Sequence, residues 1–525
     1  MRLMQIQSLL VALLCALCLV SDAVSPFKSR GNGIGVGVMM NNPTANPPNL
    51  FSPILGSHGG IRPQNYIFGD KFGEKFPQYQ SQTPVLSYVP PHHNYHNKFQ
   101  NHFSGSHQTN INRPRQFRNP FDVIYEWHQL DFEYPTFLDR QRAILNGDFI
   151  PTNNVPLGVD RWRNRLFVTM PRWKNGIPAS LASLPLPALD RSPPMRPYPT
   201  WDWHSNPEAL QPDCTRLMSV YRIWVDECDR LWVLDSGIIN ATIQINPVCP
   251  PKLLVFDLRT DQPIFSYEFP PDQVKEDSLH SNLIVDIRNG RCNDAHAYIT
   301  DVWRYGITVF SLAKGRSWRI SHHFFYPNPE ACDYTLNGLN FQWTDGVFGM
   351  SLSPINEPPD RLLFFHPMSS FGEFLVSTSV LRNESAWTLN NGAGQAGSFV
   401  QIGDRGNRGQ SSTSGIDRNN VQFFTLVQQN AVGCWDSDQP YFQNTIDIVA
   451  QDNTTLIFPN DLKVDQELDQ GVWVLSNRLP VYLYSQLDFT DINFRIQRAS
   501  TRDAIIGTAC DTNILKQPLH TLAMP

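Results

Sequence analysis

Polar and aromatic side chains recur close together along this chain, where short apolar runs meet turns. The polar members of this set are Asp226, His280, Asn282, Asp286, Asn340, Gln342, Asn460 and Asp461. A carboxylate or an imidazole beside aromatic rings can remove a proton from a bound molecule or hold an ammonium ion. The sequence has no nucleophile elbow, HExxH motif, phosphate loop or dinucleotide fingerprint, so no cofactor is predicted.

One pair within this set is distinctive. Asn460–Asp461 follows Phe458 and occurs in no other repeat of the sequence, so Asp461 is the preferred candidate base. Asp286 and His280 are the alternatives. Asn282, Asn340, Gln342 and Asn460 can supply hydrogen bonds to a ligand. The aromatic residues expected to stack on a flat ligand are Phe341, Trp343 and Phe458.

The same residues have structural explanations. Aspartate at a strand–turn boundary, as at Asp226, Asp286 and Asp465, often accepts hydrogen bonds from its own backbone. Tryptophans that recur with the repeat can pack between repeats, and these are Trp232, Trp343 and Trp473. Asp235 and Asp301 each close a repeat and are possible cation ligands, but no calcium-binding loop is present and no metal is predicted.

The elements that must position these residues come from one repeated pattern. Val225–Asp235 has the pattern of a strand, a polar turn and a second strand, and Leu462–Leu475 repeats it closely. A run at Val421–Leu426 marks a further unit. Looser copies occupy Gly158–Thr169, Val285–Asp301 and Asn340–Met350.

Six such units between residues 120 and 525 predict an all-β fold, a six-bladed β-propeller. Each unit has about 68 residues, more than the roughly 40–45 that a four-stranded blade needs. Val123–Trp127 is expected to add the edge strand that closes the ring onto the last blade. Two stacked β-sandwich domains are the alternative, but they leave the internal repeat unexplained.

The N-terminal region has a different composition. Residues 1–23 combine a basic start, an apolar run at Leu9–Val20 and small residues, which predicts a signal peptide and a secreted, extracellular protein. Residues 24–119 are rich in Asn, Pro, Gly and His, carry a basic excess and are predicted to be disordered. A basic tail can anchor the protein to an acidic matrix or serve as a solvated linker. No membrane span is predicted, and a net charge of -6 argues against nucleic acid as a partner.

The cysteines and the Asn-x-Ser/Thr sites agree with secretion. Seven cysteines lie outside the predicted leader, so most are expected to pair, in a pattern that spacing alone leaves open. The candidate glycosylation sites are Asn240, Asn383 and Asn453.

Several segments resemble the insect Yellow/major royal jelly protein family, in the family's order from about residue 120 to 515. They are Asn164–Ala179, Asp226–Asp235, Gly338–Pro354, Gln429–Trp435, Phe458–Asp465 and Trp473–Pro480. The resemblance implies a secreted six-bladed propeller. It also implies a commoner six-cysteine set, Cys214, Cys228, Cys249, Cys292, Cys434 and Cys510, beside which Cys332 is additional and is the candidate unpaired thiol.

The resemblance implies a role in melanin pigmentation and in cuticle or eggshell maturation. Two hypotheses follow for the ligand. In the first, the propeller binds a small aromatic amine or a catechol derivative and acts in the extracellular matrix. In the second, it is a dopachrome-converting isomerase, with one of the candidate bases above and with Arg222 or Lys463 holding the substrate carboxylate. Whether the protein is an enzyme is left open.

Overall fold

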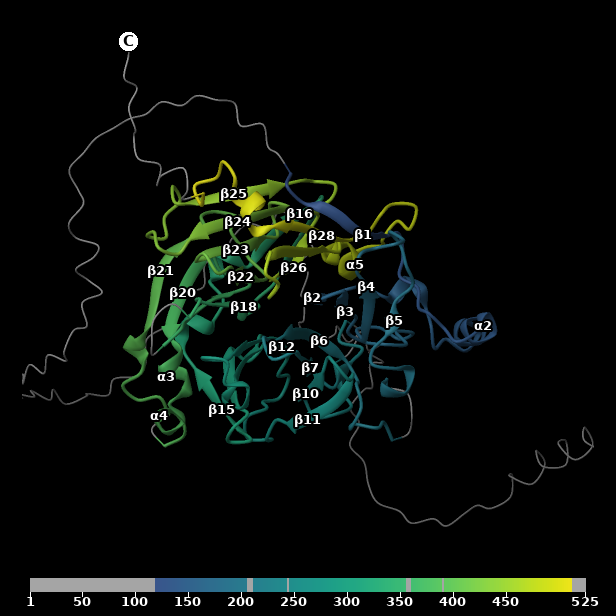
Figure 1. Cartoon of the computed structure of the whole chain (residues 1–525), viewed down its shortest axis with the longest axis horizontal. Helices are drawn as coiled ribbons and strands as arrows, with labels where there is room; N and C mark the ends of the chain where they lie inside the picture. The colour runs from purple at the N-terminus through teal and green to yellow at the C-terminus, as the bar shows by residue number, and fades with distance from the viewer. Residues whose placement is uncertain (1–118, 205–210, 243–244, 356–359, 390, 512–525) are drawn as a thin grey trace, which may run out of the picture. The chain divides into compact units, whose positions relative to one another are not determined.

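The computed structural model describes residues 119–204, 211–242, 245–355, 360–389 and 391–511. Six four-stranded antiparallel sheets form the blades of a β-propeller (Figure 1). The strands of the first three blades are β2–β5 (Gly158–Trp162, Arg165–Thr169, Leu181–Pro185, Arg196–Pro197), β6, β7, β10 and β11 (Val220–Val225, Arg230–Asp235, Lys252–Asp257, Gln262–Glu268), and β12–β15 (His280–Asp286, His296–Asp301, Gly306–Ser311, Arg316–Ser321). Those of the last three are β18–β21 (Val347–Leu352, Leu362–Pro367, Gly372–Ser377, Phe399–Asp404), β22–β25 (Ser414–Ile416, Val421–Leu426, Ala431–Asp436, Ile446–Gln451), and β26, β27, β28 and β1 (Pro459–Val464, Gly471–Ser476, Phe494–Ser500, Asp122–Trp127). The predicted fold class is confirmed.

Short elements lie outside the blades. In the described residues they include two hairpins, β8–β9 (Ile238–Ile239, Asn246–Pro247) and β16–β17 (Asp333–Leu336, Leu339–Gln342), several single-turn 3-10 helices, and the α-helices α2 (Phe137–Asn146), α3 (Thr378–Arg382), α4 (Glu384–Thr388), α5 (Leu479–Tyr484) and α6 (Thr501–Ile505). No helix in the described part of the chain is long and apolar enough to cross a membrane. The predicted leader and nearly all of the predicted extension lie outside the described residues.

The ring closes with a strand from each end of the propeller. β1 pairs antiparallel with β28, from Asp122 opposite Arg498 to Trp127 opposite Phe494. This confirms the prediction that Val123–Trp127 is the closing edge strand. The first strand therefore completes the last blade, and pairing of its backbone groups holds the two ends of the ring together.

The hairpins between the first two strands of a blade show why aspartate and tryptophan recur. Asp226 accepts hydrogen bonds from the backbone N–H groups of Cys228 and Arg230 at 2.9 and 3.1 Å, and from the Trp232 indole at 2.7 Å. In the last blade, Asp465 accepts from the Trp473 indole at 2.8 Å. The structural explanation is confirmed at these positions, because the carboxylate fixes the turn and orients the packed indole.

One predicted repeat is wrong. Asn340 and Gln342 lie on β17, which pairs only with β16, whereas the innermost strand of the fourth blade begins at Val347. The physical reason is the Asn337–Gly338 turn, where both residues have positive φ (50° and 82°), as a tight two-residue hairpin requires. Asn340 and Gln342 are therefore outside the innermost strands.

The disulfides follow the expected set. Cys214–Cys249, Cys228–Cys292 and Cys434–Cys510 are bonded, and Cys332 is a free thiol. The pairing of these six cysteines and the exclusion of Cys332 confirm the prediction.

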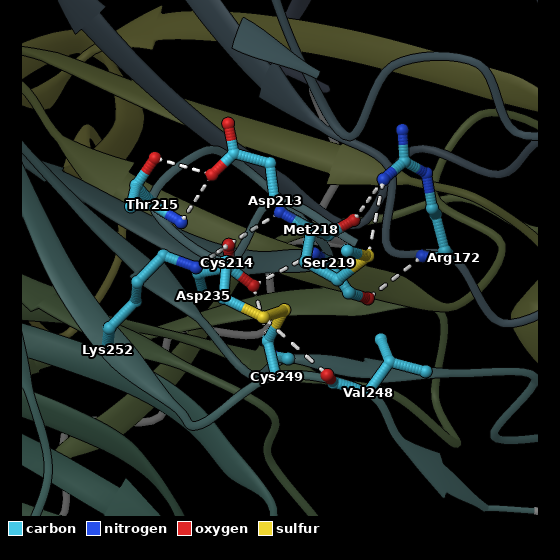
Figure 2. The surroundings of a disulfide bond; sticks show 11 residues. Arg172, Asp213, Cys214, Thr215, Met218, Ser219, Asp235, Val248, Cys249 and Lys252 are labelled. Carbon is cyan, nitrogen blue, oxygen red and sulfur yellow. Dashed lines mark hydrogen bonds and ion pairs between the residues drawn. A yellow bond between two sulfur atoms is a disulfide. The ribbon is translucent and has the colours of Figure 1, made fainter. Parts of the chain in front are cut away.

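Figure 2 shows the first disulfide beside Asp235. The Asp235 carboxylate accepts from the backbone N–H groups of Met218 and Ser219 at 2.6 and 2.8 Å and pairs with Lys252 at 3.1 Å. Asp301 pairs in the same way with Arg319, at 2.8 Å. Asp301 also accepts from the backbone N–H of Leu279 at 3.0 Å, so both aspartates anchor the loops that lead into innermost strands. Among the described residues, no group of three or more His, Cys, Asp or Glu side chains is placed to hold a metal ion.

The three glycosylation sites differ in exposure. Asn383 and Asn453 are exposed, whereas Asn240 is half-buried and has a positive φ of 54°. Modification at these sites stays a prediction.

Candidate functional site

Each blade starts at the propeller axis and adds its later strands outward. The six innermost strands are β2, β6, β12, β18, β22 and β26; each contacts the next, and β26 contacts β2 (Figure 1). We call the face where these strands begin the proximal face and the opposite face the distal face. Residues at the starts of these strands, and in the loops that lead into them, share the proximal face.

The three predicted bases do not share one site. His280 and Asp286 are the first and last residues of β12. Six steps of about 3.3 Å separate them by about 20 Å, so His280 belongs to the proximal face and Asp286 to the distal face. At the distal face, Asp286 lies near Arg288 and Arg361, at 3.3 and 3.4 Å. A single small ligand cannot contact both His280 and Asp286.

Asp461 is held in a buried ion pair. Its side chain and that of Arg222 are fully buried and in contact, and it also accepts hydrogen bonds from the backbone N–H groups of Val159 and Leu462, both at 2.9 Å. Arg222 donates to the Asn460 carbonyl at 2.8 Å. These contacts join innermost strands of the first, second and last blades. Asp461 as a base stays a prediction, but its oxygens already face three donors, from Arg222, Val159 and Leu462.

The second predicted cation is also engaged. Lys463 is 5% exposed, and burial lowers its pKa. The negative charges of Asp461 and Asp160 oppose this fall. Burial raises the pKa of Asp160 to about 7, although Lys463 opposes that rise. Both cations that the sequence offered for a substrate carboxylate, Arg222 and Lys463, thus face carboxylates of the protein itself.

His280 is buried between an aromatic ring and the charged pair of Asp301 and Arg319. Its ring stacks on Phe269 with centroids 4.8 Å apart, and neither ring nitrogen has a hydrogen-bond partner among the described residues. Burial lowers the pKa of His280 to about 4. Two residues along the strand, Asn282 donates to the Phe348 carbonyl at 2.6 Å. Both predicted site residues on the proximal part of β12 are therefore placed by packing with neighbouring blades.

The predicted aromatic residues lie together on the proximal face. The rings of Phe341 and Trp343 are 4.6 Å apart, and Phe458 packs edge-on against Trp343 at 5.7 Å. Phe341 also stacks on Tyr334 at 5.3 Å. The first three are only 1–2% exposed, so they form the packed wall of the cluster. The Trp343 indole donates to the hydroxyl of Tyr484, on α5, at 2.5 Å.

A carboxylate that the sequence reasoning did not single out lies beside this cluster. Asp345 is 6% exposed, and burial raises its pKa to about 7. A hydrogen bond from the Trp303 side chain opposes this rise. The next residue, Gly346, allows this position: an added Cβ would lie 2.6 Å from the Tyr305 ring and 2.7 Å from the Phe325 carbonyl. The available signal was an aspartate directly after Trp343–Thr344, close to the predicted aromatic residues.

Four tyrosine hydroxyls lie near enough to sense the charge of Asp345. Burial raises the pKa of each, and the Asp345 carboxylate adds to the rise, for Tyr221, Tyr305, Tyr334 and Tyr484. They come from β6, the turn after β13, β16 and α5. The Tyr221 hydroxyl accepts a hydrogen bond from the Trp173 indole. Hydroxyls with raised pKa values stay protonated at neutral pH and act as hydrogen-bond donors.

Trp303, Tyr305 and Tyr484 are half-buried, so they are the parts of this group that a ligand can reach without disturbing the packed rings. The arrangement combines a carboxyl group that titrates near neutral pH, phenolic donors and aromatic faces. It can transfer a proton to or from a flat, oxygenated ring, and in its ionised form it can hold an ammonium ion. The fold and the site define a six-bladed β-propeller with one titrating carboxylate among aromatic side chains at its proximal face.

The family model for major royal jelly proteins matches residues 218–510. A dopaminechrome tautomerase of Drosophila melanogaster is 53% identical over 398 residues, which cover 75% of this chain and 85% of that protein. Protein yellow of Drosophila melanogaster and protein yellow of Drosophila yakuba are each 41% identical over 406 residues, covering 76% of this chain and 73% of the relative. The chain belongs to the Yellow/major royal jelly protein family.

Proposed function

We propose that this chain is a secreted tautomerase that converts an aminochrome of the dopaminechrome type to a dihydroxyindole, in the pigmentation and maturation of an insect cuticle or eggshell. The observation that carries the proposal is the Asp345 carboxyl, with its pKa near 7, among the tyrosines of the proximal face. A general base is most effective when its pKa lies near the working pH. The similarity to a protein named dopaminechrome tautomerase supports the substrate class.

The reaction is an isomerisation, and it balances without a cofactor. Asp345 takes a proton from one of the two saturated ring carbons, so one C–H bond breaks. The electron pair moves through the ring to a quinone oxygen, which gains a proton, so one O–H bond forms. The neighbouring saturated carbon then loses a proton and the second quinone oxygen gains one, so two C–H bonds have been replaced by two O–H bonds in the dihydroxyindole. A protonated tyrosine that a ligand can reach, such as Tyr305, stabilises the oxygen as its negative charge develops.

The charges near the axis favour a substrate without a carboxylate. Dopachrome carries a carboxylate that needs a cation, whereas dopaminechrome does not. Arg222 and Lys463 are each engaged by protein carboxylates, as described above. Displacing either cation from its buried partner would leave a buried carboxylate unpaired, which costs several kcal/mol. We therefore expect faster turnover of dopaminechrome than of dopachrome.

Binding of an aromatic amine without turnover is the second candidate. A carboxylate beside aromatic rings is also the arrangement that holds an ammonium ion. In that case dopamine binds to the protein, dopaminechrome is not consumed, and Asp345→Asn weakens dopamine binding at pH 8 because the counter-ion is lost.

The test mixes the secreted chain with freshly made dopaminechrome and follows the loss of visible absorbance against a heat-inactivated sample. We expect saturable acceleration and a loss of 100-fold or more in kcat for Asp345→Asn, the range that general base catalysis supplies. Asp160→Asn is the matched control, because burial raises the pKa of that carboxyl to about 7 as well, but it lies on β2 and accepts from the Val225 N–H. Acceleration that survives Asp345→Asn, or that is lost equally in both variants, contradicts the assignment.

A further inference from the structure

A pocket of about 320 Å³ lies between the second and third blades, separate from the proximal-face site. The second blade contributes Val255, Ile264 and Phe265 from β10 and β11. The third blade contributes Leu312 and the rim residues Ala313 and Asn293. The volume is at the low end for small-molecule sites, and the walls are mainly apolar, as such sites usually are.

One charged side chain lines this pocket. Arg230, the first residue of β7, has a side chain that is only 8% exposed. Its Nε donates to Asp226 at 2.7 Å, and its Nη2 has no hydrogen-bond partner among the described residues. A buried guanidinium donor without a protein partner is costly, so it calls for an acceptor, which is either a water molecule or a ligand that binds there.

Asp226 does not satisfy the rest of this guanidinium. Its two oxygens already accept four hydrogen bonds, from Cys228, Trp232 and both the backbone and side chain of Arg230. Four is about the capacity of a carboxylate. The two terminal nitrogens of Arg230 are parallel donors, spaced to match the two oxygens of a second carboxylate.

A second pocket provides a comparison within the same molecule. It has about 380 Å³ and also contains an arginine, Arg405. That guanidinium is saturated: it donates to the Gly409 carbonyl, to Glu373, and to the carbonyls of Ser370 and Gly372 at 2.6–3.2 Å. Of these two pockets, only the one at Arg230 therefore combines apolar walls with an unsatisfied cationic donor, Nη2.

The rim of the Arg230 pocket is fixed by a covalent bond. Cys228 lies two residues before Arg230 and is bonded to Cys292, which directly precedes Asn293 at the rim. A rim held by a disulfide loses little conformational freedom when a ligand binds. We infer that this pocket binds a small carboxylic acid with an apolar body, whose carboxylate receives both terminal nitrogens of Arg230 while the body packs against Val255 and Phe265.

The probe is 4-phenylbutyrate, titrated calorimetrically into the secreted full chain, with 4-phenylbutyramide as its neutral counterpart of nearly the same shape. We expect one saturable site for the acid and at least tenfold weaker binding of the amide, since bidentate charge pairing is lost. Equal affinity for the acid and the amide, or no saturable binding of the acid, overturns the inference.

Two variants locate the site. Ala313→Trp fills the pocket from an exposed position, and Arg230→Lys keeps the charge beside Asp226 but removes the paired donors. We expect each to weaken binding of the acid at least tenfold. Gln443→Trp, at an exposed position in the pocket of Arg405, is the matched control and should change the affinity less than twofold. Binding that is unaffected by Ala313→Trp places the acid elsewhere and overturns the inference. Turnover of dopaminechrome should be unchanged in Ala313→Trp, so this test is independent of the proposed reaction.

Discussion

Asp345→Asn should stabilise the protein while it removes the proposed base. Burial raises the pKa of Asp345 from 3.8 to about 7. Between these values the unfolded chain releases a proton that the folded protein still holds, so the wild-type free energy of unfolding falls as pH rises from about 4 to 7. At about 1.36 kcal/mol per pKa unit, the rise in the pKa of Asp345 corresponds to a loss of about 4 kcal/mol in the free energy of unfolding at high pH. Asparagine does not ionise and so does not incur this loss.

The expected gain is therefore near zero at pH 4 and reaches at most about 4 kcal/mol at pH 8. At about 2 cal/mol/K per residue, a propeller of this size shifts its Tm by roughly 1 °C per kcal/mol, so Asp345→Asn should melt roughly 3–5 °C above wild type at pH 8. Thermal unfolding of both proteins at pH 4, 6 and 8 measures the difference. A gain that is constant with pH, or a loss of stability at pH 8, refutes a raised pKa at this carboxyl.

Three further predictions concern groups other than the proposed base. Asp461→Asn leaves Arg222 without its carboxylate and should lower the free energy of unfolding by about 3–5 kcal/mol, measured by urea denaturation; a neutral effect contradicts the ion pair. Cys434→Ser opens a loop of 76 residues and should cost about 4 kcal/mol in the same assay, whereas Cys332→Ser should cost less than about 1 kcal/mol, and equal costs contradict the pairing. As pH falls from 6.5 to 4, the unfolded wild-type imidazole takes up a proton and the folded one does not, so wild type should lose about 3 kcal/mol more free energy of unfolding than His280→Leu. Parallel pH profiles of the two proteins contradict the lowered pKa of His280.

The fold followed from the sequence because its signals are periodic. The Asp226–Trp232 and Asp465–Trp473 hairpins repeat the same contact, so the pattern of residues reports a physical unit that the second and last blades share. The Asn340–Met350 copy failed because a local signal, the Asn337–Gly338 turn, forms its own hairpin outside the blades. Similar sequence patterns therefore formed two different structures, a hairpin within a blade and a separate hairpin outside the blades.

The site was less accessible to sequence reasoning because it depends on contacts between blades. Asp461 stood out by its asymmetry, yet that asymmetry serves an ion pair with Arg222 that joins the last blade to the second. Asp345 looked ordinary, since its pKa depends on burial next to Trp303 and near Tyr221, which lie far away in the chain. Desolvation is a property of the folded ring and leaves no local pattern of residue types.

The most direct test of the proposed base is the pH dependence of kcat/KM for dopaminechrome tautomerisation. The base must be ionised to accept the ring proton, so kcat/KM should rise with pH through an apparent pKa near 7 and level off above it. Asp160→Asn should keep this inflection, and Asp345→Asn should lose it together with most of the rate. A wild-type rate without an inflection between pH 5.5 and 8.5, or an unchanged profile in Asp345→Asn, would contradict the account.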